Sequence, residues 1–168
     1  MADLTKPILG IVVVAVSWYF YMDSGKPAPK VGRPAPDFSL KDYQWGTDYT
    51  LSKYKDKVVL VNFWATWCPP CRGEIPDFVQ VRDALAPKGF EILGVSIDRD
   101  GAAAVGPFLK MTPMSYPVLA GTPEVQALYG GIHAIPTSFL IDRKGTIRDS
   151  WEGGIDGSRL REKVAALL

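Results

Sequence analysis

The sequence VVLVNFWATWCPPC, residues 58–71, runs from an unbroken apolar segment directly into a Cys-x-x-Cys pair. A continuous run of β-branched and aromatic residues suits a strand that is covered on both faces. The two prolines between the cysteines suit the first turn of a helix, because proline lacks the N–H that this turn leaves unpaired. We therefore predict that a buried strand over 57–64 delivers Cys68 to the start of a helix over 69–85.

The position of Cys68 at a helix start favours thiol chemistry. Unpaired backbone N–H groups and the positive end of the helix dipole stabilise a thiolate, which is the form that attacks disulfides. Cys71 follows one turn later, so it is placed to attack a mixed disulfide between Cys68 and a substrate. These are the only cysteines of the chain, so they react with each other or with another molecule. The pattern predicts a site of thiol–disulfide exchange.

Three other interpretations of the cysteine pair are open. A closed zinc site needs about four Cys or His ligands, whereas the chain offers two cysteines and one histidine, His133. A purely structural disulfide across so short a loop removes little entropy from the unfolded chain. Two ordinary core cysteines leave the Pro-Pro between them unexplained. Redox activity accounts for these residues best, and His133 is interpreted as a plain loop residue rather than a copper ligand.

The rest of the sequence alternates strand-like and helix-like segments. Besides 57–64, the expected strands are a piece ending at Leu40 that pairs with 49–51, then 90–98, 116–119, and a hairpin of 137–141 with 145–152. Two short helices are expected within 101–129, and an amphipathic helix over 158–168. This alternation predicts a layered α/β domain with a mixed sheet.

The N-terminus predicts a membrane anchor. Residues 8–22 contain no charged side chain, and they end in the aromatic cluster of residues 18–21, typical of a membrane interface. A span of about 19 residues from Leu4, with Lys6 reaching the interface, just crosses a bilayer core. A cleaved signal peptide cut after Ser17 and a buried soluble helix are the alternatives.

The chain is accordingly divided into three parts. Residues 1–22 are the expected single-pass transmembrane anchor, residues 23–30 a linker rich in Pro and Gly, and residues 31–168 one globular domain. A formal net charge of +1 over 168 residues and the lack of a basic run argue against a nucleic-acid partner. Hydrophobic residues make up 47% of the chain, which is enough for one core.

Three motifs together resemble the thioredoxin fold, and most closely the membrane-anchored TlpA, ResA and CcmG type. The motifs are the active-site segment 62–71, the segment PAPDF at 34–38, and IPT at 135–137 followed by an apolar strand. The resemblance covers about residues 31–168. It implies an α/β thioredoxin fold whose central mixed sheet is flanked by helices, with an N-terminal β-hairpin and a central strand–helix insertion within 98–129, after one transmembrane helix.

The resemblance also implies which residues form the site. Ile135-Pro136 would be a cis peptide in a loop beside the cysteines, where it offers backbone groups to an incoming peptide. Trp67, Pro69 and Pro70 would border the same substrate groove. Asn62 occupies the position of a buried aspartate in ordinary thioredoxins. Glu74, one turn after Cys71, then becomes the expected carboxyl that accepts the Cys71 proton.

The function expected from the resemblance is a protein disulfide reductase in the inner membrane, with its domain in the periplasm. Its clients would be proteins with disulfides or cysteine pairs, such as apocytochrome c or copper-site proteins, and a membrane thiol reductase would supply electrons. It would use no cofactor beyond the redox-active Cys68–Cys71 disulfide. The alternatives are a thiol oxidase on the same fold, a copper-binding module resembling Sco proteins, and a peroxidase.

Overall fold

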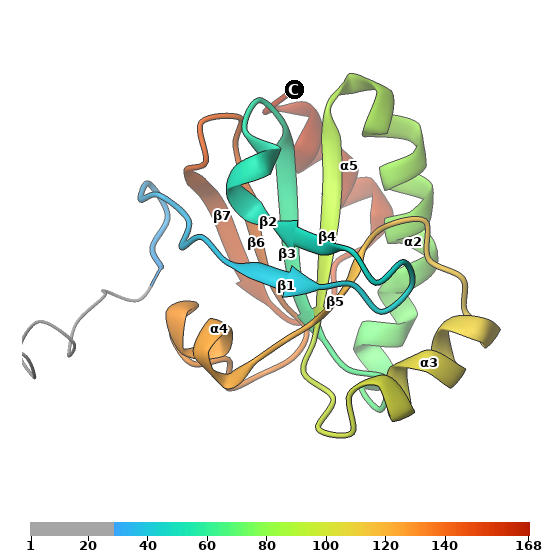
Figure 1. Ribbon diagram of the computed structural model, residues 1–168. Helices are drawn as coiled ribbons and strands as arrows, with labels where there is room; N and C mark the ends of the chain where they lie inside the picture. Colours follow the sequence, from blue (N-terminus) through green and yellow to red (C-terminus); the bar gives the residue numbers. More distant parts are fainter. Residues whose placement is uncertain (1–28) are drawn as a thin grey trace, which may run out of the picture.

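The computed structural model describes residues 29–168, which form a five-stranded mixed sheet with a separate two-stranded hairpin (Figure 1). The strand order is β5-β4-β3-β6-β7, with parallel pairing from β3 to β5 and antiparallel pairing of β6 with β3 and β7. The sheet strands are β3 Val58–Trp64, β4 Phe90–Ser96, β5 Val118–Ala120, β6 Thr137–Ile141 and β7 Ile147–Glu152. This mixed sheet confirms the predicted α/β class and thioredoxin fold.

Helices cover both faces of the sheet, and the N-terminal hairpin lies over one of them (Figure 1). The helices are α2 Pro69–Leu85, α3 Ala102–Met111, α4 Pro123–Leu128 and α5 Gly157–Ala165, and the hairpin is β1 Ser39–Lys41 with β2 Asp48–Thr50. Short 3₁₀ turns occupy Leu51–Tyr54 and Ala86–Lys88. The predicted hairpin is confirmed, and the segment 98–129, where a strand–helix insertion was expected, contains α3, β5 and α4 in that order.

The alternation of side chains along β3 builds two cores. All seven residues of β3 are buried. Leu60 and Trp64 pack with α2, α3 and α5, whereas Val61 and Phe63 pack with the hairpin and α4. Successive strand residues point to opposite faces, so Asn62 necessarily faces the α2 side. This places one polar group in the core beneath the helix that carries the cysteines.

Three predicted strand limits and one helix limit are wrong by two or three residues, and the strand expected over 116–119 spans Val118–Ala120. The strand that begins at Phe90 ends at Ser96 rather than Asp98, because the Asp98 carboxylate turns back to bind Thr66. β7 begins at Ile147, since the Asp142 carboxylate accepts hydrogen bonds from the backbone of residues 144 and 146 and forms a turn there. The last helix spans Gly157–Ala165, short of the predicted end at 168.

The predicted anchor and most of the predicted linker lie outside the described residues. Within residues 29–168, no helix combines the length and the hydropathy that a bilayer crossing requires. The anchor over 1–22 therefore stays a prediction.

Candidate active site

A tight turn connects β3 to α2 and sets Cys68 at the helix start. The Cys68 N–H donates to the Ala65 carbonyl at 3.2 Å, which closes the turn over residues 65–68. Cys68 is the N-cap of α2, in extended conformation, and its Sγ accepts the backbone N–H of Cys71 at 3.3 Å. Pro69 and Pro70 follow as the first helical residues. The sulfur thus occupies the place of a capping oxygen, as predicted.

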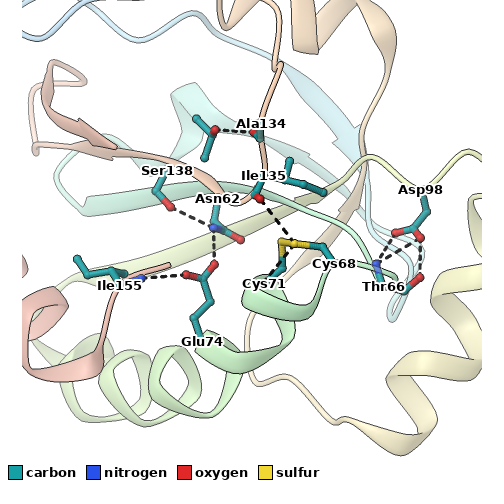
Figure 2. The surroundings of a disulfide bond; sticks show 11 residues. Asn62, Thr66, Cys68, Cys71, Glu74, Asp98, Ala134, Ile135, Ser138 and Ile155 are labelled. Atoms are coloured by element: carbon teal, nitrogen blue, oxygen red, sulfur yellow. Dashed lines mark hydrogen bonds between the residues drawn. A yellow bond between two sulfur atoms is a disulfide. The ribbon is translucent and has the colours of Figure 1, made fainter. Parts of the chain in front are cut away.

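Cys68 and Cys71 form a disulfide that packs against the loop before β6 (Figure 2). The cysteines are only 3% and 1% exposed. The Cys68 Sγ lies 3.7 Å from the Ile135 carbonyl oxygen. A disulfide sulfur carries no proton, so in this oxidised state the approach is a contact; after reduction, the same geometry suits an S–H donor.

The loop that supplies this carbonyl contains the predicted cis peptide, Ile135-Pro136. The loop is fixed on both sides of the proline. Thr137 Oγ1 donates to the Ala134 carbonyl at 2.7 Å, and the Gly153 N–H donates to the Pro136 carbonyl at 2.8 Å. The prediction of a cis bond beside the cysteines is therefore confirmed.

The residues predicted to border a substrate groove surround the buried disulfide. Trp67 is 64% exposed, an unusual position for a tryptophan. Pro69 and Pro70 are also exposed, while Ile135 is half-buried and Pro136 is buried. The sequence-predicted residues therefore meet around the sulfurs, although they come from two segments separated by more than sixty residues. What they bind stays a proposal.

Glu74 lies beneath the disulfide, on the side of α2 that faces the sheet (Figure 2). It is 4% exposed, deeper than the half-buried site expected from sequence. Its Oε1 accepts from Asn62 Nδ2 at 3.0 Å and its Oε2 from the Ile155 N–H at 3.3 Å. Burial raises the pKa of Glu74 from 4.5 to about 7, against the lowering effect of the two hydrogen bonds. The carboxyl is therefore poised to exchange a proton near neutral pH.

Asn62 is predicted to tune this carboxyl. Its Nδ2 also donates to Ser138 Oγ at 3.0 Å. Replacing Asn62 with alanine removes a donor that stabilises the carboxylate, so the pKa of Glu74 is expected to rise further. Carboxyl NMR titration of Asn62→Ala measures the change. Ser138→Ala is the control, because it removes the other partner of Asn62 without removing a bond to Glu74; an unchanged pKa in Asn62→Ala would contradict the prediction.

His133 lies exposed on the loop that precedes the cis peptide. It lines a cavity of about 360 Å³ together with Gly131, Thr137 and Glu152, among other residues. In the described part of the chain, no three His, Cys, Asp or Glu side chains are grouped so as to hold a metal ion.

Sequence reasoning missed the polar contacts that support the site. Thr66 binds the Asp98 carboxylate through both its backbone N–H and its hydroxyl. Ser138 and the Ile155 N–H complete the surroundings of Asn62 and Glu74. An acidic residue directly after a buried strand was a usable signal for Asp98, because such strand ends meet the active-site edge of an α/β sheet. No comparable signal marks Ser138 or Ile155.

The AhpC/TSA family model matches residues 31–150 of this chain. The match begins before the N-terminal hairpin and extends into β7. It therefore includes both cysteines, the cis peptide and the central insertion.

Individual proteins similar to this chain have names that refer to thiol–disulfide exchange. The thiol:disulfide interchange protein DsbE of Pseudomonas fluorescens biotype C is 34% identical over 97% of this chain and 91% of that protein. The thiol-disulfide oxidoreductase ResA of Geobacillus kaustophilus is 32% identical over 94% of this chain and 88% of that protein. The crystal structure of a thioredoxin-family thiol:disulfide interchange protein from Chlorobium tepidum TLS superimposes with a TM-score of 0.74 at 35% identity, covering 85% of this chain and 99% of that one.

Proposed function

Because this chain belongs to the AhpC/TSA family and is a thiol–disulfide oxidoreductase of the ResA and DsbE type, we propose that it reduces disulfides of client proteins at a membrane surface. The observation that carries the proposal is the placement of Cys68. Its Sγ receives the Cys71 N–H at the start of α2, where a thiolate is stabilised after reduction.

The reaction proceeds in two exchanges. The Cys68 thiolate attacks one sulfur of the client disulfide, a Cys68–client bond forms, and the client's second sulfur leaves as a thiolate. The Cys71 thiolate then attacks Cys68 Sγ, which re-forms the internal disulfide and releases the client's first sulfur. Two electrons pass from the protein to the client. A second dithiol, from a membrane thiol reductase, returns the pair to its reduced state.

Glu74 is the proposed acceptor of the Cys71 proton. The two residues are one turn apart on α2, and both side chains are buried on its sheet-facing side. With a pKa of about 7, the carboxyl is a stronger base than an ordinary glutamate and loses its own proton near neutral pH. It thereby favours the Cys71 thiolate in the second exchange.

The client is proposed to bind in extended form across the cis-proline loop. The carbonyl of Ile135 already faces the disulfide, and the exposed Trp67 offers an apolar contact beside it. Pro69 and Pro70 form the remaining border of this groove. Backbone pairing of this kind recognises many sequences, because it reads no particular side chain.

The membrane and client assignments rest on the sequence. The uncharged residues 8–22 support a single inner-membrane anchor, with residues 31–168 in the periplasm. The resemblance to the TlpA, ResA and CcmG type supports clients that carry cysteine pairs, such as apocytochrome c or copper-site proteins.

The first test is the reduction potential of the full-length protein. Fluorescence of the exposed Trp67, beside the pair, is followed as the buffer is poised with thiol and disulfide. We expect a potential below about −220 mV, which suits a reductant with a membrane donor. A potential near about −120 mV would reverse the direction of the reaction and support the thiol oxidase.

A further inference from the structure

The Asp98 carboxylate lies just beyond the end of β4 and accepts hydrogen bonds from the active-site turn (Figure 2). Its Oδ2 and Oδ1 lie 3.0 and 3.3 Å from the Thr66 backbone nitrogen, and its Oδ1 accepts the Thr66 hydroxyl at 2.6 Å. Ser96 Oγ donates to Oδ2 at 2.8 Å. Within residues 29–168 no basic side chain forms an ion pair with Asp98. The carboxylate is therefore stabilised by the hydrogen bonds from Thr66 and Ser96.

These bonds hold the turn that carries the nucleophile. Thr66 and Trp67 are the two central residues of the turn closed by the Cys68 N–H and the Ala65 carbonyl. Trp67 points into solvent, so burial of its side chain does not fix the turn. Hydrogen bonds to an ionised acceptor are stronger than neutral ones, and two of them reach the residue two positions before Cys68.

We propose that Asp98 is a positioning residue that keeps Cys68 at the N-cap of α2 once the disulfide has been reduced. In the oxidised protein the Cys68–Cys71 bond restrains Cys68 by itself. Reduction removes that bond, and the Asp98–Thr66 contacts then keep the Cys68 thiolate near the Cys71 N–H. The proposal rests on the thiol exchange proposed above. It makes Asp98 responsible for keeping the nucleophile, Cys68, reactive.

The position of Asp98 distinguishes this role from a purely electrostatic one. A carboxylate near a thiolate disfavours the thiolate by repulsion, so removing the charge alone makes Cys68 more reactive. Removing the anchor of the turn makes Cys68 less reactive, because the thiolate loses its fixed place beside the helix N–H groups. The two roles therefore predict changes of opposite sign.

The test measures alkylation of Cys68 by iodoacetamide as a function of pH, in the full-length protein carrying Cys71→Ser so that one thiol reacts. In Asp98→Ala we expect the rate at neutral pH to fall by about fivefold or more, with the Cys68 titration moved to higher pH. Thr66→Val, which keeps the backbone bond, is expected to show a smaller fall. Asp98→Asn, which keeps an acceptor oxygen, is expected to recover most of the parent rate.

Asp100→Ala is the matched control, since Asp100 is exposed in the same loop, and its rate is expected to equal that of the parent. The other charged groups on the cysteine helix are the same in every variant; they are Arg72, Glu74, Asp77, Arg82 and Asp83. An alkylation rate of Cys68 that is unchanged or higher in Asp98→Ala would overturn the proposal. If Asp98→Ala does not fold, an unchanged alkylation rate in Thr66→Val would overturn the proposal instead. A parent Cys68 that titrates like a free thiol would instead contradict the proposed function.

Discussion

Replacing Cys68 with serine is expected to lower the rate of disulfide reduction by about a thousandfold or more. A serine hydroxyl stays protonated at neutral pH and does not attack a disulfide, whereas the Cys68 sulfur receives an N–H at the helix start that favours its thiolate. Thiol-dependent reduction of insulin by the full-length protein measures the effect. Activity retained in Cys68→Ser would show that the exchange does not begin at this residue.

Cys71→Ser is the paired variant that separates the two exchanges. Cys68 remains able to attack, but no second thiol releases the client, so a covalent complex through Cys68 is expected to accumulate. Non-reducing gel electrophoresis with a disulfide-containing client detects the complex. Accumulation in Cys68→Ser instead would exchange the roles of the two cysteines.

Replacing Glu74 with glutamine is expected to remove a pH-dependent loss of stability. The pKa of Glu74 is about 7 in the folded protein and 4.5 as the reference for the unfolded chain, so the folded state binds more protons between these values. Stability from this group is therefore complete below about pH 4.5 and is lost as the pH rises through about 7. Between about pH 5 and about pH 8.5 the native protein should lose roughly 2 to 3 kcal/mol relative to Glu74→Gln.

Urea denaturation of the oxidised proteins at the two pH values measures this difference. Glutamine leaves one hydrogen bond to Asn62 or Ile155 poorly matched, but that loss is constant with pH and cancels between the two measurements. Glu162→Gln, at an exposed position of α5, serves as the control. If the difference in free energy of unfolding between the native protein and Glu74→Gln is the same at both pH values, Glu74 ionises like a surface carboxyl.

Glu74 should also affect the rate of the second exchange, in which Cys71 releases the client. If Glu74 accepts the Cys71 proton, release of the client from the mixed disulfide should accelerate through about pH 7 in the native protein. The same step should lose this acceleration in Glu74→Gln. Stopped-flow measurement of client release follows the step directly, and identical pH profiles for the two proteins would contradict the proposed role.

The central secondary structure was predictable from local patterns. Residues 58–64 were expected to form a strand buried on both faces, because every position is apolar or β-branched except Asn62, and the structure confirms it. The helix over 69–85 begins where Pro69 and Pro70 allow it, and its observed limits match the prediction. The strand after Phe90 was predicted too long, since hydrophobic patterning does not reveal that the Asp98 side chain turns toward Thr66.

The residues of the candidate site were easier to predict from the sequence than the contacts among them. The cysteine pair followed from spacing, and the cis bond at Ile135-Pro136 followed from a family resemblance, because an isolated Ile-Pro sequence is usually trans. The burial of Glu74 was underestimated. One residue on a helix face does not reveal that the Ile155 segment, some eighty positions away, will cover it.

The sequence by itself determined that this chain places two cysteines at the start of a helix, and thereby determined its thiol chemistry. That information is local, since three-residue spacing and helix capping act within one turn. Only the tertiary structure decided which groups surround the two cysteines. Packing of β3, α2 and the β7–α5 connection buries Glu74 and sets its pKa, while the end of β4 brings Asp98 to the active-site turn. Burial and long-range hydrogen bonds depend on segments that meet only in the folded chain.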